Sequence, residues 1–141
     1  MIVVLDTNVL IRAAFRRDLD PDNLVARASR GEFEIATSAP LMAELSRMLS
    51  ARRLEPYYRW QVGEIEQFLR TLEARARNVE PSVELDVVRD AADNRLIEAA
   101  VEAEADYIVS TDRDLLDLVE YAGVQIVTQA QFLAILRTAP L

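Results

Sequence analysis

The sequence contains no cysteine, no histidine and no lysine among its 141 residues. These absences exclude a disulfide framework, a cysteine nucleophile, an imidazole general base and a zinc site of cysteine and histidine ligands. Any catalysis by this chain therefore depends on carboxylates, hydroxyls, amides or arginine. Metal binding would use oxygen ligands, which favour hard cations such as Mg²⁺ or Mn²⁺.

Glycine is scarce and long apolar runs are missing. With only 3 glycines, the chain has no G-x-G-x-x-G or Walker loop, so a nucleotide cofactor is not expected. No run approaches the roughly 18–20 apolar residues of a membrane span, and no cationic leader precedes the apolar start. We therefore expect a cytoplasmic protein with no membrane partner. The length fits a single domain over residues 1–141.

Positive charge is also in short supply, since the formal net charge is −8. This charge disfavours a polyanionic ligand, because proteins that bind nucleic acids usually carry a positive surface. The objection weakens if bound cations neutralise several acids. All 16 basic residues are arginine. Three groups of them that are close in sequence could gather on one basic face, or they could simply be solvated surfaces of helices. These groups are Arg12, Arg16 and Arg17; Arg47, Arg52, Arg53 and Arg59; and Arg70, Arg75 and Arg77.

The pattern of apolar residues predicts strands that alternate with helices. Strands are expected at 2–5, 34–37, 107–110 and 124–127, with a brief edge strand at 78–81. Helices are expected to about residue 15, over 24–31, 40–52, 60–76, 90–105, 115–121 and 129–137. The fold class is therefore α/β, with three layers and a central, mostly parallel sheet of four or five strands.

Four acidic residues are expected at one edge of this sheet, where open parallel sheets bind ligands. Asp6 follows the first strand, Asp112 follows the 107–110 strand, and Glu44 lies about one turn into the helix after the second strand. Asp93 lies in the first turn of the helix that leads into the 107–110 strand. A right-handed crossover would return that helix start to the same edge.

Each of these acids also has an ordinary structural explanation. Asp6 and Asp112 could be helix N-caps, and Asp93 could interact with the positive end of a helix capped by Asp90. Glu44 could be an exposed acid. Four carboxylates in one pocket, however, would repel one another unless protons or cations compensate, and Mg²⁺ is the natural partner.

Three segments carry a resemblance to a known family. The segments VLDTNVLI at 4–11, PLMAEL at 40–45 and DNRLIEAAVEAEADYIVSTDRDLL at 93–116 look like those of a single PIN domain, and the match spans nearly the whole chain. The sequence most resembles toxin-like PIN proteins of the VapC kind. In that family the four acids of the site correspond to Asp6, Glu44, Asp93 and Asp112 of this chain.

The resemblance also assigns supporting residues. Thr7 or Asn8, together with Ser110, match the polar residues that support the acids, and Asp114 matches an additional acid that could equally belong to the first turn of a helix. Ser110 and Thr111 replace the commoner Thr-Gly before Asp112, which puts the geometry of the loop in question more than metal binding.

The resemblance implies cleavage of RNA by a Mg²⁺- or Mn²⁺-dependent endonuclease, with water attacking phosphorus. Asp6, Asp93 and Asp112 would hold the metal, and Glu44 would be a further ligand or would orient the water. Thr7, Asn8 and Ser110 would fix the carboxylates by hydrogen bonds. Arginines near the cleft, such as Arg12 or Arg95, would contact phosphates.

A toxin of this kind implies a cognate antitoxin and association into a homodimer. Leu54, Tyr57, Tyr58 and Trp60 could form the surface for such a partner, although burial in the core is the simpler fate of Trp60. The alternative is a catalytically silent PIN-like module that only binds other proteins. A phosphotransfer enzyme is disfavoured, because the chain has Asp6-Thr7-Asn8 instead of Asp-x-Asp and has no lysine.

Overall fold

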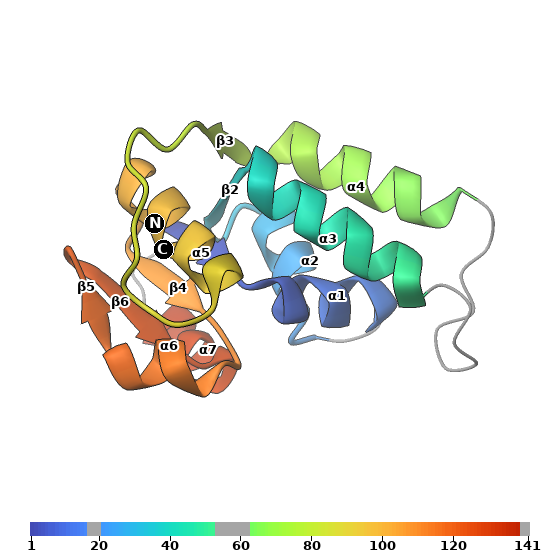
Figure 1. Cartoon of the computed structure of the whole chain (residues 1–141). Helices are drawn as coiled ribbons and strands as arrows, with labels where there is room; N and C mark the ends of the chain where they lie inside the picture. Colours follow the sequence, from blue (N-terminus) through green and yellow to red (C-terminus); the bar gives the residue numbers. More distant parts are fainter. Residues whose placement is uncertain (17–20, 53–62, 139–141) are drawn as a thin grey trace.

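A computed structural model describes residues 1–16, 21–52 and 63–138 of the chain. Six strands form one sheet in the order β3-β2-β1-β4-β6-β5 (Figure 1). Their bounds are β1 Ile2–Leu5, β2 Glu34–Ser38, β3 Arg77–Val79, β4 Tyr107–Val109, β5 Glu120–Tyr121 and β6 Val124–Val127. All neighbouring pairs are parallel except β5 with β6. The predicted α/β fold with a mostly parallel sheet is confirmed.

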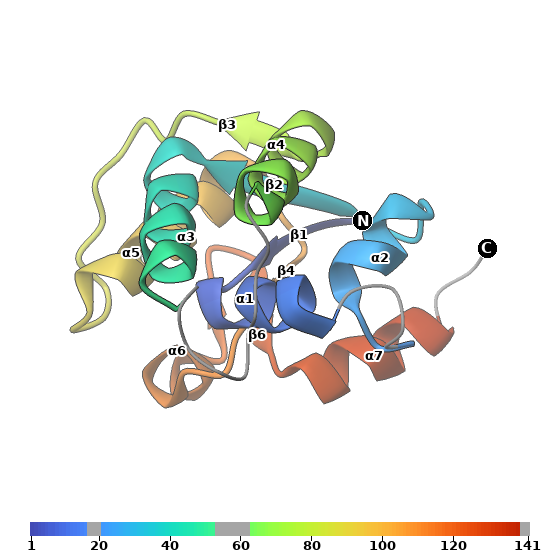
Figure 2. The same ribbon diagram turned by 90° about the vertical axis from the view of Figure 1, so that its right-hand side faces the viewer.

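Helices cover both faces of the sheet (Figures 1 and 2). Their bounds are α1 Thr7–Arg16, α2 Leu24–Ser29, α3 Ala39–Arg52, α4 Glu64–Arg75, α5 Ala91–Glu102, α6 Arg113–Leu118 and α7 Gln129–Thr138. Because side chains of a strand alternate between faces, Val3 and Leu5 of β1 pack with α1, α2, α4 and α7, whereas Val4 packs with α5 and α6. Helix α3 contributes to both clusters, through Leu45 and Leu49 on one side and Leu41 on the other.

The sheet has more strands than the four or five predicted, because the expected helix over 115–121 was wrong at its end. Helix α6 ends at Leu118, and Val119 has a φ of 67°. Tyr121 and Val124 then pair across a two-residue turn whose residues, Ala122 and Gly123, both have positive φ. This is the backbone that a tight antiparallel hairpin requires. The turn therefore converts the end of an apolar segment into the edge strand β5.

Some predictions fall on residues that the structure does not describe. The proposed partner surface of Leu54, Tyr57, Tyr58 and Trp60 lies outside the described residues, as does the start of the amphipathic segment expected from Trp60. The described part of that segment, α4, begins at Glu64 after Gly63. Within the described ranges, no helix has the length and apolar character needed to cross a bilayer.

The long connection between β3 and α5 places the start of α5 at the edge of the sheet where the parallel strands end. Residues 80–90 run from the edge strand β3 across to α5, which packs on β1, β2 and β4 (Figure 1). The chain then turns at Ala103 to Ala105 and enters β4 from the opposite edge. The crossover therefore brings Asp93 to the same edge as the ends of β1, β2 and β4, as its sequence position predicted.

Candidate active site

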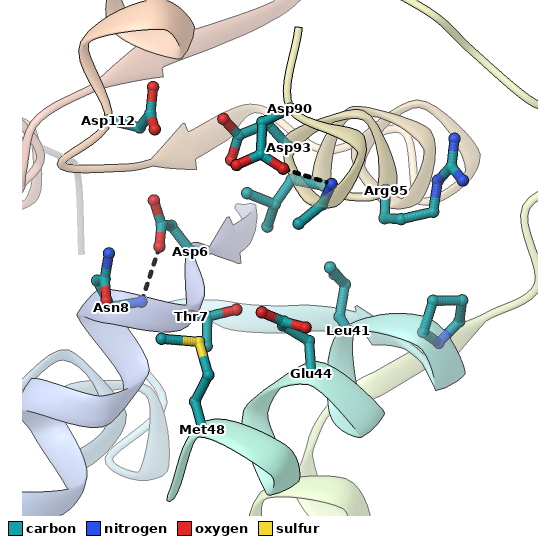
Figure 3. A pocket seen from close by; sticks show the side chains of 13 residues that line it. Asp6, Thr7, Asn8, Leu41, Glu44, Met48, Asp90, Asp93, Arg95 and Asp112 are labelled. Atoms are coloured by element: carbon teal, nitrogen blue, oxygen red, sulfur yellow. Dashed lines mark hydrogen bonds between the residues drawn. The ribbon is translucent and has the colours of Figure 1, made fainter. Parts of the chain in front are cut away.

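A pocket opens at the carboxyl ends of the parallel strands and contains all four predicted acids (Figure 3). Its walls come from the start of α1, from α3 and from the start of α5, with Asp112 at the start of α6. The lining residues are Asp6, Thr7, Asn8, Pro40, Leu41, Glu44, Met48, Asp90, Ala92, Asp93, Arg95, Leu96 and Asp112. Five of these residues are acidic and one is basic, so the pocket attracts cations.

Asp6 is held rigidly at the end of β1. Its backbone amide donates to Val109 of β4 over 3.0 Å, which extends the strand pairing by one residue. Its carboxylate accepts the amide of Asn8 at Oδ1 over 2.7 Å and the hydroxyl of Ser110 at Oδ2 over 2.6 Å. The side chain is buried, so these two bonds fix the carboxylate in one orientation.

Asp112 combines a capping role with a place in the pocket. Its Oδ1 atom accepts the amides of Asp114 over 2.8 Å and Leu115 over 3.4 Å, which makes it the N-cap of α6. Its own amide donates to Ser110 Oγ over 2.9 Å. Ser110 therefore links Asp6 to the backbone of Asp112. The N-cap explanation for Asp112 is correct, but it occupies only one carboxylate oxygen and is compatible with a second role.

Asp93 is the least satisfied acid in the pocket. Its side chain is buried, with 7% exposed, and its Oδ2 atom has no hydrogen-bond partner. Burial above all, then the negative charges of Asp112, Asp90 and Asp6 and a side-chain hydrogen bond to Asp112, together raise the pKa of Asp93 to about 7. Asp90 is the N-cap of α5, as expected, through its bond from the Ala92 amide. A proton or a bound cation would therefore stabilise the Asp93 carboxyl in this position.

Glu44 stands on the opposite wall, on α3 (Figure 3). It forms an ion pair with Arg47 over 2.8 Å and is not among the charges that act on Asp93. Within residues 1–16, 21–52 and 63–138, no three acidic side chains are close enough together to form a ready-made metal site. The fold therefore gathers the four acids around one space, with Asp6, Asp93 and Asp112 as neighbours and Glu44 across from them, without packing them into a closed ligand set.

Of the other residues predicted for the site, some line the pocket and others lie outside it. Thr7 and Asn8 line the pocket, and Asn8 supports Asp6 through its backbone amide and not through its side chain. Asp114 lies outside the pocket lining and pairs with Arg89 over 2.9 Å. Arg95 lines the pocket, but it points away from the acids (Figure 3). Arg12 lies at a different site, beside Asn23 and Gln129.

Sequence reasoning missed what holds Arg95 and the start of α5. The guanidinium of Arg95 donates to Glu98 over 2.7 Å and to the Leu85 carbonyl over 3.3 Å. Glu98 and the neighbouring Asn94 are both buried, and both bind the connection that precedes α5. The spacing of Asn94, Glu98 and Glu102 at every fourth residue of a helix was the available sign of this polar stripe.

Comparisons with known proteins identify a family and a similar fold. A family model described as PIN domain matches residues 2–114. A chain in the crystal structure of VapBC2 from Rickettsia felis bound to a DNA fragment from its promoter has a similar fold, with a TM-score of 0.57. The similarity covers 89% of this chain and 97% of that chain at 16% identity. No curated protein shows a significant match.

Proposed function

This chain is a member of the PIN domain family, and we propose that it is a Mg²⁺- or Mn²⁺-dependent endoribonuclease, the toxin of a toxin–antitoxin pair. The observation that carries the proposal is the buried Asp93 carboxyl, whose Oδ2 atom has no partner although Asp6 and Asp112 crowd it with negative charge. A divalent cation would compensate all three carboxylates at once, and oxygen ligands suit Mg²⁺ and Mn²⁺.

The residues divide into those that would hold the cation and those that orient them. Asp6, Asp93 and Asp112 would bind it. Asp93 Oδ2 has no partner and the cap bonds of Asp112 use only Oδ1, whereas each Asp6 oxygen accepts one hydrogen bond and would bind the cation through a remaining lone pair. The Asn8 amide and the Ser110 hydroxyl keep the Asp6 carboxylate in place. Such supporting bonds set the direction of metal ligands. The cap bonds of Asp112 have the same effect on the third ligand.

The chemistry proposed is hydrolysis of an RNA phosphodiester. A bound cation would lower the pKa of a water and offset the negative charge that develops on the phosphoryl oxygens. Glu44 faces the three aspartates from the opposite wall of the pocket, so it would accept a hydrogen bond from the attacking water or complete the ligand set. The water oxygen would form a bond to phosphorus as the bond from phosphorus to the leaving oxygen breaks, and the proton lost by the water would be balanced by one that the leaving oxygen takes up.

The negative pocket makes substrate binding dependent on the cation. Among the lining residues, Asp6, Glu44, Asp90, Asp93 and Asp112 would repel a phosphate, and Arg95 is already engaged by Glu98. RNA would therefore enter the pocket only after the acids are neutralised. This explains how a chain with a net charge of −8 could act on a polyanion.

We also propose a biological setting for this chain. The structural neighbour comes from VapBC2, which supports a cognate antitoxin for this chain. A homodimer and action on RNA in the cytoplasm belong to the same proposal and rest on the toxin role. We take residues 1–141 as a single PIN domain. Strand β6 and helix α7 lie beyond the matched residues 2–114, yet β6 pairs with β4 and Phe132 of α7 is fully buried in the same core.

The test is the substitution Asp6→Asn, measured by calorimetric titration with Mn²⁺ and by cleavage of a panel of structured RNAs with and without Mn²⁺. The variant should fold and lose Mn²⁺-dependent cleavage by more than the roughly 10–100-fold that follows loss of a supporting residue. Asp106→Asn is the matched control, because Asp106 also bonds β1, through the Ile2 amide, but at the far edge of the sheet. It should keep full activity.

Two results would contradict the proposal. Cleavage that persists in Asp6→Asn would remove Asp6 from the site. A folded wild-type chain that neither binds Mn²⁺ nor cleaves any RNA would favour the silent interaction module.

A further inference from the structure

Asp6 lies between two serines at the end of the sheet. The pairing of Val4 with Ala36 in β2 and of Leu5 with Val109 in β4, continued along the strands, places Asp6 beside Ser38 and Ser110. Val4 and Ala36 belong to the core cluster that α5 covers. Because side chains alternate along a strand, Asp6 and Ser38 project from that same face.

The two serines differ in what their hydroxyls do. Ser110 Oγ donates to Asp6 and accepts the amide of Asp112. Ser38 Oγ is buried, with the residue 1% exposed, and has no hydrogen-bond partner. Most buried hydroxyls have a partner, because leaving one unpaired costs free energy. The position of Ser38 therefore calls for a specific explanation.

Unpaired polar atoms concentrate at this corner of the molecule. In the part of the chain that the structure describes, three buried side-chain nitrogen or oxygen atoms lack a partner: Ser38 Oγ, Asp93 Oδ2 and Arg95 Nε. Asp93 and Arg95 line the pocket, and Ser38 immediately precedes α3, whose Pro40 and Leu41 line it too. Helix α5, which carries Asp93, packs against β2, which carries Ser38. An unused donor on β2 and an unused acceptor on α5 thus belong to packed elements beside the pocket.

The geometry points to Ser38 as a positioning residue of the metal site. With a cation bound, its hydroxyl would donate its one proton to a neighbouring carboxylate, Asp6 at the end of β1 or Asp93 of α5, and so steady the arrangement that a divalent cation requires. Ser110 does the same for Asp6 from the opposite side. This inference rests on the proposed function, because Ser38 can hold the carboxylates in a metal-binding arrangement only if the site binds a cation.

The experiment compares Mn²⁺ binding by calorimetry with thermal unfolding of the metal-free protein. Ser38→Ala should weaken Mn²⁺ binding by about 10–100-fold, the usual effect of losing a group that orients a ligand. Its metal-free unfolding temperature should stay the same or rise, because the variant loses a buried hydroxyl that has no partner. Ser38→Thr keeps a hydroxyl and suits a strand, so it should restore most of the affinity.

Two further variants separate positioning from simple burial. Thr37→Val removes a buried hydroxyl from the adjacent residue, on the other face of β2, and should leave Mn²⁺ binding unchanged. Ser38→Cys keeps the shape of the side chain but donates only weakly, so it should bind Mn²⁺ less tightly than wild type even if Ser38→Ala fails to fold.

The outcomes distinguish this inference from the proposed function. Mn²⁺ affinities of Ser38→Ala and Ser38→Cys within about twofold of wild type, with Asp6→Asn impaired, would overturn the role of Ser38 and leave the proposed function intact. A Ser38→Thr variant as weak as Ser38→Ala would also overturn it. A wild-type chain that binds no Mn²⁺ would overturn both.

Discussion

Helix α5 carries two buried carboxylates that behave in opposite ways. Asp93 and Glu98 are 7% and 6% exposed. Glu98 accepts the Leu85 amide over 2.7 Å and the Arg95 guanidinium over 2.7 Å. Asp93 instead has an unpaired oxygen and faces two other aspartates of the site. Burial of an acid therefore does not by itself mark a functional site, and the difference lies in whether the fold supplies partners.

The partners of Glu98 come from the connection that precedes the helix. Residues 82–88 form no strand, so their backbone amides need other acceptors. Asn94 accepts from Val87 and Val88, and Glu98 accepts from Leu85. Glu102 accepts from Ser82. This polar stripe of Asn94, Glu98 and Glu102 attaches the connection to α5 and so fixes the first turn, where Asp93 must sit.

The largest effect on stability is expected for Glu98→Ala. The substitution leaves the Leu85 amide and the Arg95 guanidinium without their acceptor, so the free energy of unfolding should fall by about 3 kcal/mol. Denaturation in urea measures it. Glu102→Ala is the control, one turn along the same stripe. Because Glu102 is exposed, this variant should lose less than about 1 kcal/mol of its free energy of unfolding. Equal costs for the two variants would contradict the structural role of Glu98.

Asp93→Asn should change the free energy of unfolding less than Glu98→Ala does, and should raise it in the metal-free protein. Burial and the charges of Asp112, Asp90 and Asp6 raise the pKa of Asp93 in the folded state to about 7 from its ordinary 3.8. The folded state therefore binds this proton more tightly than the unfolded state does. The stability of the wild type that depends on this proton is lost as the pH rises from about 4 through 7.

Asparagine carries no charge, so the variant should be more stable than wild type at pH 8 and should lose this advantage toward pH 4. Thermal unfolding with a chelator, at a series of pH values, measures the difference. Saturating Mn²⁺ should reverse the order, because only the wild type has the carboxylate to bind it. A constant difference between the two proteins at every pH would show that Asp93 does not titrate in this range.

The smallest effect is expected for Arg89→Ala, which tests a carboxylate that is paired but exposed. Arg89 contacts Asp114 over 2.9 Å, with 87% of the arginine side chain exposed. Solvent screens such a pair, so the free energy of unfolding should change by less than about 1 kcal/mol, and less still in high salt. A loss as large as that of Glu98→Ala would mean that pairing matters more than burial for the acids near this pocket.

The sequence predicted much of the candidate site because local rules govern its main elements. Asp6 and Asp112 directly follow buried apolar strands, and parallel strands end at a common edge, so their approach could be inferred from the pattern alone. The hairpin of β5 and β6 was missed because the helical pattern over 115–121 competes with a turn that depends on the backbone of Ala122 and Gly123. The positive φ of these two residues therefore allows a hairpin where the sequence pattern predicted the end of a helix.

What the sequence alone determined is the chemistry available to the protein. Without cysteine, histidine or lysine it offers oxygen ligands for a hard cation, and alternating strands and helices bring acids to one edge of a sheet. Only the tertiary structure decided which acids remain unsatisfied. Asp93 and Glu98 lie on one helix, and their difference arises because the connection 82–88 and Arg95 reach Glu98, whereas Asp93 faces an open pocket with Asp6 and Asp112 and has an oxygen without a partner. The Leu85 amide reaches Glu98 from 13 residues away in the sequence, and the i, i+3 spacing of Arg95 and Glu98 does not by itself predict that contact.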